Sequence, residues 1–177
     1  MKAAPGFRSS SSRLRRLTIM SLAVSLSAVG AFIKVPGPVG SIALDSWPGY
    51  LSALALGPDG AVVAFAGHLA SALSAGFPLG LVLHLVVAGE MALCALAFRW
   101  VSLRAGVVAG AIAAVALNGL MAPVALVPWL GWGLVVSLFL PLSLAAAANV
   151  IAASVAYQVI PFWRFTSGPG SRSSKGS

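Results

Sequence analysis

A single carboxylate, Glu90, lies near the middle of the apolar segment Leu79–Phe98. A carboxylate at the centre of a lipid bilayer is costly, so it is expected either to serve a function or to pair with a neighbour. The sequence leaves both interpretations open: contact with a ligand, or a hydrogen bond that joins helices. His84 lies six residues earlier in the same segment, about 120° around a helix from Glu90. The two side chains therefore do not share one stripe, although both can face the interior of a bundle.

Two amides, Asn118 and Asn149, lie in the last two long apolar segments. An amide side chain both donates and accepts hydrogen bonds. We expect Asn118, near the outer end of its segment, to contact a ligand, whereas Asn149, near mid-depth, is more typical of a residue that joins helices. His68 lies among Gly, Ala and Ser, which also favours a helix contact over a ligand contact.

Trp129 and Trp132 lie beside Pro128 and Gly131. Tryptophan at this level of a membrane protein commonly marks the lipid–water interface. In a loop, however, either ring could cover a pocket and stack on a flat ligand. The chain has no phosphate-binding glycine loop, nucleophile elbow or HExxH sequence, and two histidines alone make a poor metal site. The sequence therefore predicts no catalytic residue, metal or cofactor.

The composition predicts an integral membrane protein. Of the 177 residues, 59% are hydrophobic and 8% are charged, whereas a soluble domain normally has about a quarter charged residues. The net charge of +8 would suggest nucleic acid as a partner of a soluble protein. Here the basic residues gather at the two ends and in one central junction, where membrane topology explains them better, so nucleic-acid binding is disfavoured. The only cysteine, Cys94, lies among apolar residues and is expected to pack.

We predict an all-α fold: an integral membrane bundle of six transmembrane helices, with short helices 2 and 3. A straight span needs about 20 apolar residues. The expected helices are Leu17–Val35, Ser46–Leu56, Asp59–Ser74, Leu79–Phe98, Leu103–Val124 and Gly133–Val159. Pro and Gly interrupt the chain repeatedly between residues 35 and 80. Irregular backbone at membrane depth is tolerated only where protein buries it or it lines a cavity, so these breaks indicate a binding site.

The distribution of Lys and Arg predicts that both termini are cytoplasmic. With that orientation, every basic residue except Lys34 falls on the cytoplasmic side. We expect residues 17–161 to form the membrane domain, and residues 1–16 and 162–177 to be disordered basic tails. Arg15-Arg16 followed by a short apolar run also resembles a secretory or twin-arginine signal, with a passable cleavage site at Ala28-x-Gly30. An uncleaved first helix is favoured, because the rest of the chain stays membrane-like.

Several segments resemble the substrate-binding S components of energy-coupling factor (ECF) vitamin transporters. The run Trp47–Leu56 leads into Gly57-Pro58 and then a helix rich in Gly and Ala, after a first helix with small residues at a spacing of four. The resemblance spans about residues 17–161. Within the family, Val35–Pro38, Leu44–Tyr50, Gly67–Leu69 and Gly76–Gly80 look most like the S component for α-ribazole, the dimethylbenzimidazole nucleoside salvaged for cobalamin synthesis.

The resemblance implies a six-helix S component in the bacterial cell membrane that binds a vitamin or vitamin precursor near the outer face. It implies no enzyme activity: two ATPase subunits and a transmembrane coupling subunit supply the energy. The family's helix 1 docking motif falls on Ala23, Ser27 and Ala31. The regions that bind substrate in the family hold the polar and aromatic residues Asp45, His84, Glu90, Asn118, Trp129, Trp132 and Asn149.

For α-ribazole, Trp129 or Trp132 with Tyr50 could stack on the base, and a second set could contact polar atoms. In that set Asp45, Asn118 and Glu90 would accept hydroxyl protons, and His84 would face a ring nitrogen. Pantothenate-type S components share part of the pattern, and the carboxylate of pantothenate would require a cation, for which Lys34 is the nearby candidate. Two other classes stay open: a small membrane enzyme that uses Glu90, and a structural or assembly protein.

Overall fold

The computed structural model describes residues 5–37 and 40–160, and contains six helices and one β-hairpin there. In chain order the elements are α1 (Pro5–Gly30), β1 (Lys34–Gly37), β2 (Gly40–Ala43), α2 (Trp47–Leu56), α3 (Asp59–Ser74), α4 (Leu81–Ala105), α5 (Val107–Ala125) and α6 (Val127–Val159). The helical bundle and the short α2 and α3 agree with the expectation from the sequence.

The first helix differs from its expected bounds at both ends. It begins at Pro5, so residues 5–16, which the sequence placed in a tail, are helical. It ends at Gly30, five residues before the predicted Val35. A Cβ on Gly30 would collide with the backbone carbonyl of Leu44, so only glycine permits this close approach of the helix end to the returning chain. The expected tail 162–177 lies outside the described residues.

The expected outer loop between the first two helices is an antiparallel β-hairpin. β1 and β2 pair in the register Lys34↔Ala43, Val35↔Ile42, Pro36↔Ser41 and Gly37↔Gly40. A further bond from the Leu44 amide to the Ile33 carbonyl, 3.1 Å long, continues the pairing toward α1. Pro36 disfavours helical backbone at the preceding residue, which explains why the helix cannot continue here.

Among the described residues, three helices are long and apolar enough to cross a membrane: Leu81–Ala105, Val107–Ala125 and the Val136–Val159 portion of α6. α2 has 10 residues and α3 has 16, fewer than the roughly 20 that a straight span needs. The chain is thus a membrane protein, while six complete spans stay a prediction. α6 begins at Val127, six residues before its expected start, and is broken at Gly131, whose φ is 75°.

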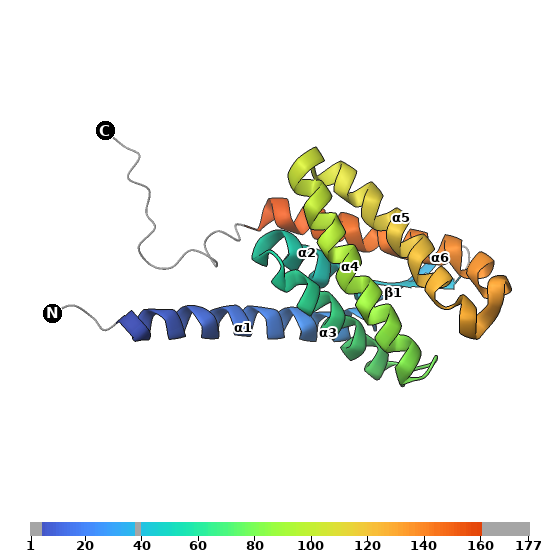
Figure 1. Cartoon of the computed structure of the whole chain (residues 1–177), viewed down its shortest axis with the longest axis horizontal. Helices are drawn as coiled ribbons and strands as arrows, with labels where there is room; N and C mark the ends of the chain where they lie inside the picture. The colour runs from blue at the N-terminus through green and yellow to red at the C-terminus, as the bar shows by residue number, and fades with distance from the viewer. Residues whose placement is uncertain (1–4, 38–39, 161–177) are drawn as a thin grey trace.

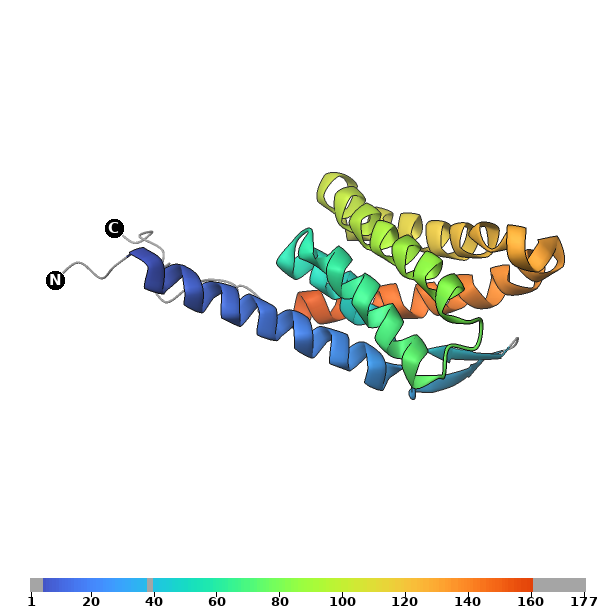
Figure 2. The same cartoon turned by 60° about the horizontal axis from the view of Figure 1, so that its bottom comes forward.

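The helix ends and the connections between helices lie at two opposite ends of an elongated bundle (Figures 1 and 2). The start of α1, the end of α6 and the α2–α3 and α4–α5 turns lie toward one end, and the first turns of α1 project beyond the other helices. The hairpin and the α3–α4 and α5–α6 connections lie toward the opposite end, which we call the hairpin end. Both ends of the described chain therefore lie on the same side of the bundle.

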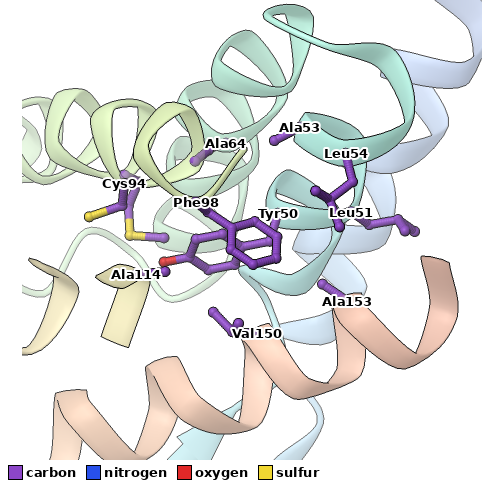
Figure 3. Close-up of a cluster of buried hydrophobic side chains, with 12 residues drawn as sticks. Tyr50, Leu51, Ala53, Leu54, Ala64, Cys94, Phe98, Ala114, Val150 and Ala153 are labelled. Atoms are coloured by element: carbon purple, nitrogen blue, oxygen red, sulfur yellow. The ribbon is translucent and has the colours of Figure 1, made fainter. Parts of the chain in front are cut away.

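The core forms where α2 crosses α4, α5 and α6 (Figure 3). The rings of Tyr50 and Phe98 meet edge to face, with centroids 5.5 Å apart and an interplanar angle of 84°. Small side chains, among them Ala114 and Ala153, are fully buried around the two rings. Small neighbours let the helices approach closely, and the two large rings then fill the remaining space.

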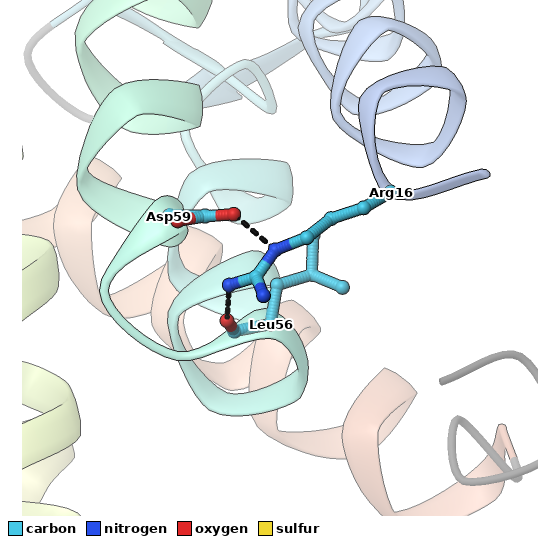
Figure 4. A network of polar contacts seen from close by, with 3 residues as sticks. All are labelled: Arg16, Leu56 and Asp59. Atoms are coloured by element: carbon cyan, nitrogen blue, oxygen red, sulfur yellow. Dashed lines mark hydrogen bonds and ion pairs between the residues drawn. The ribbon is translucent and has the colours of Figure 1, made fainter. Parts of the chain in front are cut away.

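Two arginines donate hydrogen bonds to carbonyl groups at the carboxyl end of α2. Arg16 of α1 pairs with Asp59 and also donates to the Leu56 carbonyl at 2.9 Å (Figure 4). Arg99 of α4 donates to the Ala53 carbonyl at 3.0 Å. The last carbonyls of a helix have no partner within the helix, so these guanidinium groups satisfy them and complement the negative end of the helix dipole.

Candidate functional site

Two adjoining pockets lie beneath the hairpin end. The first, about 330 Å³, lies between the start of α2 and helices α3 to α6; the second, about 260 Å³, lies between the end of α1, β2, α3 and the α3–α4 connection. Ala43, Asp45, His68 and His84 line both pockets. Most other lining side chains of the first pocket are aliphatic, from Leu79 on the connection to Ala146 on α6.

Asp45 is held at the boundary between the pockets. One carboxylate oxygen accepts a hydrogen bond from the Ser71 hydroxyl at 2.6 Å, and the other accepts from the Ser46 hydroxyl at 3.0 Å. Two hydroxyl donors fix the rotamer of the carboxylate without neutralising its charge. A carboxylate oxygen has more than one acceptor position, so both oxygens retain capacity for a ligand donor. Asp45 lines both pockets, and its role in substrate binding stays a prediction.

His84 and His68 form the rest of that boundary. Nε2 of His68 lies 3.2 Å from Nδ1 of His84, so one of the two nitrogens carries the shared proton. The Nε2 atom of His84 is buried and has no hydrogen-bond partner in the described residues. A buried polar atom without a partner is costly, and a polar ligand atom would satisfy it. The ring of Phe77, from the α3–α4 connection, lies 5.6 Å from the ring of His84.

Asn118 lines the first pocket and reaches the core beneath it. Its amide nitrogen lies 3.1 Å from both the Tyr50 hydroxyl and the Met91 sulfur. Tyr50 itself is 1% exposed and lines neither pocket. The expected stacking of Tyr50 on a ligand therefore needs correction: its ring fills the core against Phe98, and its hydroxyl orients Asn118 from below.

Both polar atoms of the Asn149 side chain form hydrogen bonds with other groups of the protein. Its oxygen accepts from the backbone amides of Ser46 and Trp47, both at 2.9 Å, and its nitrogen donates to the carbonyls of Ala43 and Ala145, at 2.8 and 2.9 Å. The Ser46 side chain does not cap α2, so Asn149 supplies the N-cap from another helix. Although it borders the first pocket, it has no bond left for a ligand, which corrects its assignment as a binding residue.

Glu90 lies apart from the pockets. It is 5% exposed and lines neither of them. One oxygen accepts from the Cys94 thiol at 2.9 Å, and the other has no partner in the described residues. Glu90 thus bonds along its own helix and reaches neither pocket, so its predicted contact with a ligand gains no support from the pockets.

The two tryptophans also lie away from the pockets. Trp129 is 55% exposed and Trp132 is 66% exposed, and neither lines either pocket. The break at Gly131 separates the two residues. This placement gives no support to stacking on a ligand, and a position at the lipid–water interface stays the alternative interpretation.

The small-residue stripe of α1 is covered from within the chain. Ser27 is 2% exposed, and a Cβ on Gly67 of α3 would lie 2.6 Å from its hydroxyl oxygen. Ala31 lines the second pocket, and Ala23 is half-buried. Ser27 therefore packs α1 against α3, while docking of a partner by Ala23, Ser27 and Ala31 stays a prediction.

Three contributors to the site were missed by the sequence reasoning. The sequence favours a helix contact for His68, and it does not single out Ser71 or Met91. The sequence does place Ser71 and His68 on one face of a helix, because they lie three residues apart. No sequence pattern distinguished that face from the opposite one, because α3 is rich in small residues all round.

A comparison with models of protein families identifies a match for this chain. The model of the family "ECF transporter, substrate-specific component" matches residues 15–165, most of the chain. Comparisons with curated proteins and with solved structures gave no match. The matched range contains every residue of both pockets. Together with the apolar helices and the pockets between them, this match identifies the chain as a member of the family of substrate-specific components of ECF transporters, which are membrane substrate-binding subunits and not enzymes.

Proposed function

We propose that this chain is the substrate-binding subunit of an ECF-type ABC importer that takes up α-ribazole, a cobalamin precursor. The ligand binds in the adjoining pockets at the hairpin end, and the subunit delivers it inward with a coupling subunit and two ATPase subunits. The observation that carries this proposal is a mainly aliphatic pocket with the polar atoms of Asp45, His84 and Asn118 at its boundary.

The size and lining of the pockets suit a ring-bearing nucleoside. Small-molecule sites typically have volumes of about 300–1,000 Å³ and few polar groups, and the first pocket, at about 330 Å³, lies within that range. Its aliphatic wall, with the thioether of Met91, would hold a benzimidazole. Asp45 would accept protons from ribose hydroxyls, and Nε2 of His84 would face a polar ring atom.

The charge of the site favours a ligand without a carboxylate. Asp45 is an anion at the boundary of both pockets, and no Lys or Arg lines either of them in the described residues. A carboxylate beside Asp45 would be repelled, because like charges at close range in a low dielectric are strongly unfavourable. Pantothenate stays the alternative substrate; it would depend on Lys34, whose side chain lies outside the described part of the structure.

We also propose that the hairpin end faces outward and that both termini are cytoplasmic. Arg16, Arg99 and Arg104 support this orientation, because they lie toward the end opposite the hairpin, with both ends of the described chain. Basic residues are retained on the cytoplasmic side. The pockets would then open toward the side from which a nutrient arrives.

Equilibrium binding of labelled α-ribazole to the purified full-length protein tests the proposal, with pantothenate as competitor. Asp45→Asn should weaken binding by roughly tenfold to a hundredfold, because a hydrogen bond to a charged group contributes about 1.5–3 kcal/mol. Asp59→Asn is the matched control: it makes the same chemical change at the opposite end of the bundle and should leave affinity unchanged.

Two outcomes would contradict the proposal. Displacement by pantothenate at a lower concentration than by unlabelled α-ribazole would assign the site to the other vitamin. Binding of neither compound would reject both assignments. Affinity purification tests the partners separately: recovery of the chain without a coupling subunit or ATPase after gentle extraction would contradict the transporter complex.

A further inference from the structure

A second feature lies at the opposite end of the molecule from the ligand pockets. A groove of about 450 Å³ runs along the outer face of α4 beside the α2–α3 turn, lined by Pro58, Leu96, Ala97, Arg99, Trp100 and Leu103. Its apolar residues are open to the surroundings: Trp100 is 58% exposed and Leu103 is 68% exposed. Since α4 is long and apolar enough to cross a membrane, we expect this groove to face lipid.

Two guanidinium groups border the groove. Arg99 lines it and uses one terminal nitrogen on the Ala53 carbonyl, while its other two nitrogens have no partner in the described residues. The guanidinium carbon of Arg104 lies 3.9 Å from the centre of the Trp100 ring, which holds it beside the groove. Neither arginine forms an ion pair with a described residue, whereas Arg16 at the same end pairs with Asp59.

An apolar groove beside two unneutralised guanidinium groups matches an amphiphile with a negatively charged head. Arginine binds phosphate oxygens through two parallel hydrogen bonds, and the Trp100 ring restricts Arg104 before any ligand arrives. Basic pockets beside membrane helices are typical sites for anionic lipid head groups. A zwitterionic lipid would bring its own cation close to the same arginines and so would gain less.

We propose that this groove binds one anionic phospholipid, with an acyl chain along Leu96 and Leu103 and the phosphate facing Arg99 and Arg104. The lipid would tie α4 to the α2–α3 turn at the end of the bundle opposite the ligand pockets. This site is independent of the substrate proposed above, because no residue of the groove lines either ligand pocket.

Trp100 allows a direct test with the full-length protein in phosphatidylcholine vesicles. Phosphatidylglycerol or phosphatidylcholine carrying bromine on an acyl chain is titrated into separate samples, and quenching of tryptophan emission is measured at each concentration. The Trp100→Phe protein gives the background from the other four tryptophans. We expect the brominated anionic lipid to quench Trp100 at a several-fold lower concentration than the brominated zwitterionic lipid.

Arg104→Gln should reduce this preference about fivefold, since one basic residue near a membrane surface contributes about that factor. The preference is a ratio within each protein, so a change in the emission of Trp100 itself cancels. Arg13→Gln is the matched control, because Arg13 is an exposed basic residue of α1 that does not line the groove. It should leave the preference unchanged, and thermal unfolding checks that both variants are folded.

Three results would overturn the proposal. Equal quenching by the two lipids would mean that acyl chains enter the groove without selection of the head group. Absence of quenching by both would mean that protein covers the groove, for example a second copy of the chain. Retention of the full preference in Arg104→Gln would mean that Arg104 does not contact the phosphate, which the proposal requires.

Discussion

Nε2 of His68 lies 3.2 Å from Nδ1 of His84, and this contact joins α3 to α4 at the boundary of the two ligand pockets. The two residues are 16 apart in the chain, separated by the end of α3 and the turn that follows it. Their contact leaves Nε2 of His84 without a partner in the described residues. One histidine thus fixes the orientation of the other, whose second nitrogen stays available for a ligand.

His84→Phe should weaken ligand binding up to about tenfold, because a neutral hydrogen bond contributes about 0.5–1.5 kcal/mol. His84→Gln, which keeps a polar end on a shorter side chain, should lose less. Equilibrium binding of the labelled ligand measures both. If Phe at this position bound as tightly as histidine, the unpartnered nitrogen would have no role in recognition.

His68→Phe should weaken binding by a smaller factor than His84→Phe, because His68 acts mainly by orienting its neighbour. A double-mutant cycle separates this positioning effect from direct contact. We expect the two losses to be less than additive, since removal of His84 makes its orientation irrelevant. Strict additivity would show that the residues act independently.

Glu90→Gln should leave ligand affinity within about twofold of the wild-type value, because Glu90 lines neither pocket. The amide oxygen can still accept the hydrogen bond from Cys94, so stability should change little. The same binding assay provides the measurement, with Asp45→Asn as the variant that should lose affinity. A large loss of ligand affinity in Glu90→Gln would mean that this residue contributes to ligand binding.

Asn149→Ala should lower the thermal unfolding temperature measurably. The change removes the N-cap of α2, which typically costs about 1 kcal/mol, and leaves the buried amides of Ser46 and Trp47 without their partner. Ser154→Ala is the matched control on the same helix, because its hydroxyl bonds only to a carbonyl of the preceding turn. Equal unfolding temperatures for the two variants would contradict the capping role.

Gly67→Ala should destabilise the protein by about 1–3 kcal/mol, the usual cost of adding a methyl group to a closely packed contact. The new Cβ would lie 2.6 Å from the Ser27 hydroxyl and would force α1 away from α3. Gly89→Ala makes the same change on α4, where no atom beyond the adjacent residues and the local helix backbone lies within 4 Å of the added methyl group, so helix propensity should make it neutral or stabilising. Denaturation of both variants in the same detergent gives the comparison.

The sequence by itself determined the environment of the chain and most of its helices. The high apolar content and scarce charges require a membrane, and the turn at Gly57-Pro58 divides α2 from α3 where Pro and Gly permit it. Periodicity and composition are local properties, so they predict local structure. The hairpin was missed because the segment 34–43 is short and contains Pro and Gly, which resemble a loop in sequence.

Only the tertiary structure decided which polar residues serve the pocket. Glu90, Asn118 and Asn149 look alike in sequence, because each is a single polar group in an apolar helix. In the structure Glu90 bonds to Cys94 on its own helix, the Asn118 side chain borders the first pocket, and Asn149 caps α2. Their roles depend on the rotation of each helix about its axis. In helices that are apolar on all sides, no hydrophobic stripe in the sequence predicts this rotation. Contacts with neighbouring helices determine the rotation instead.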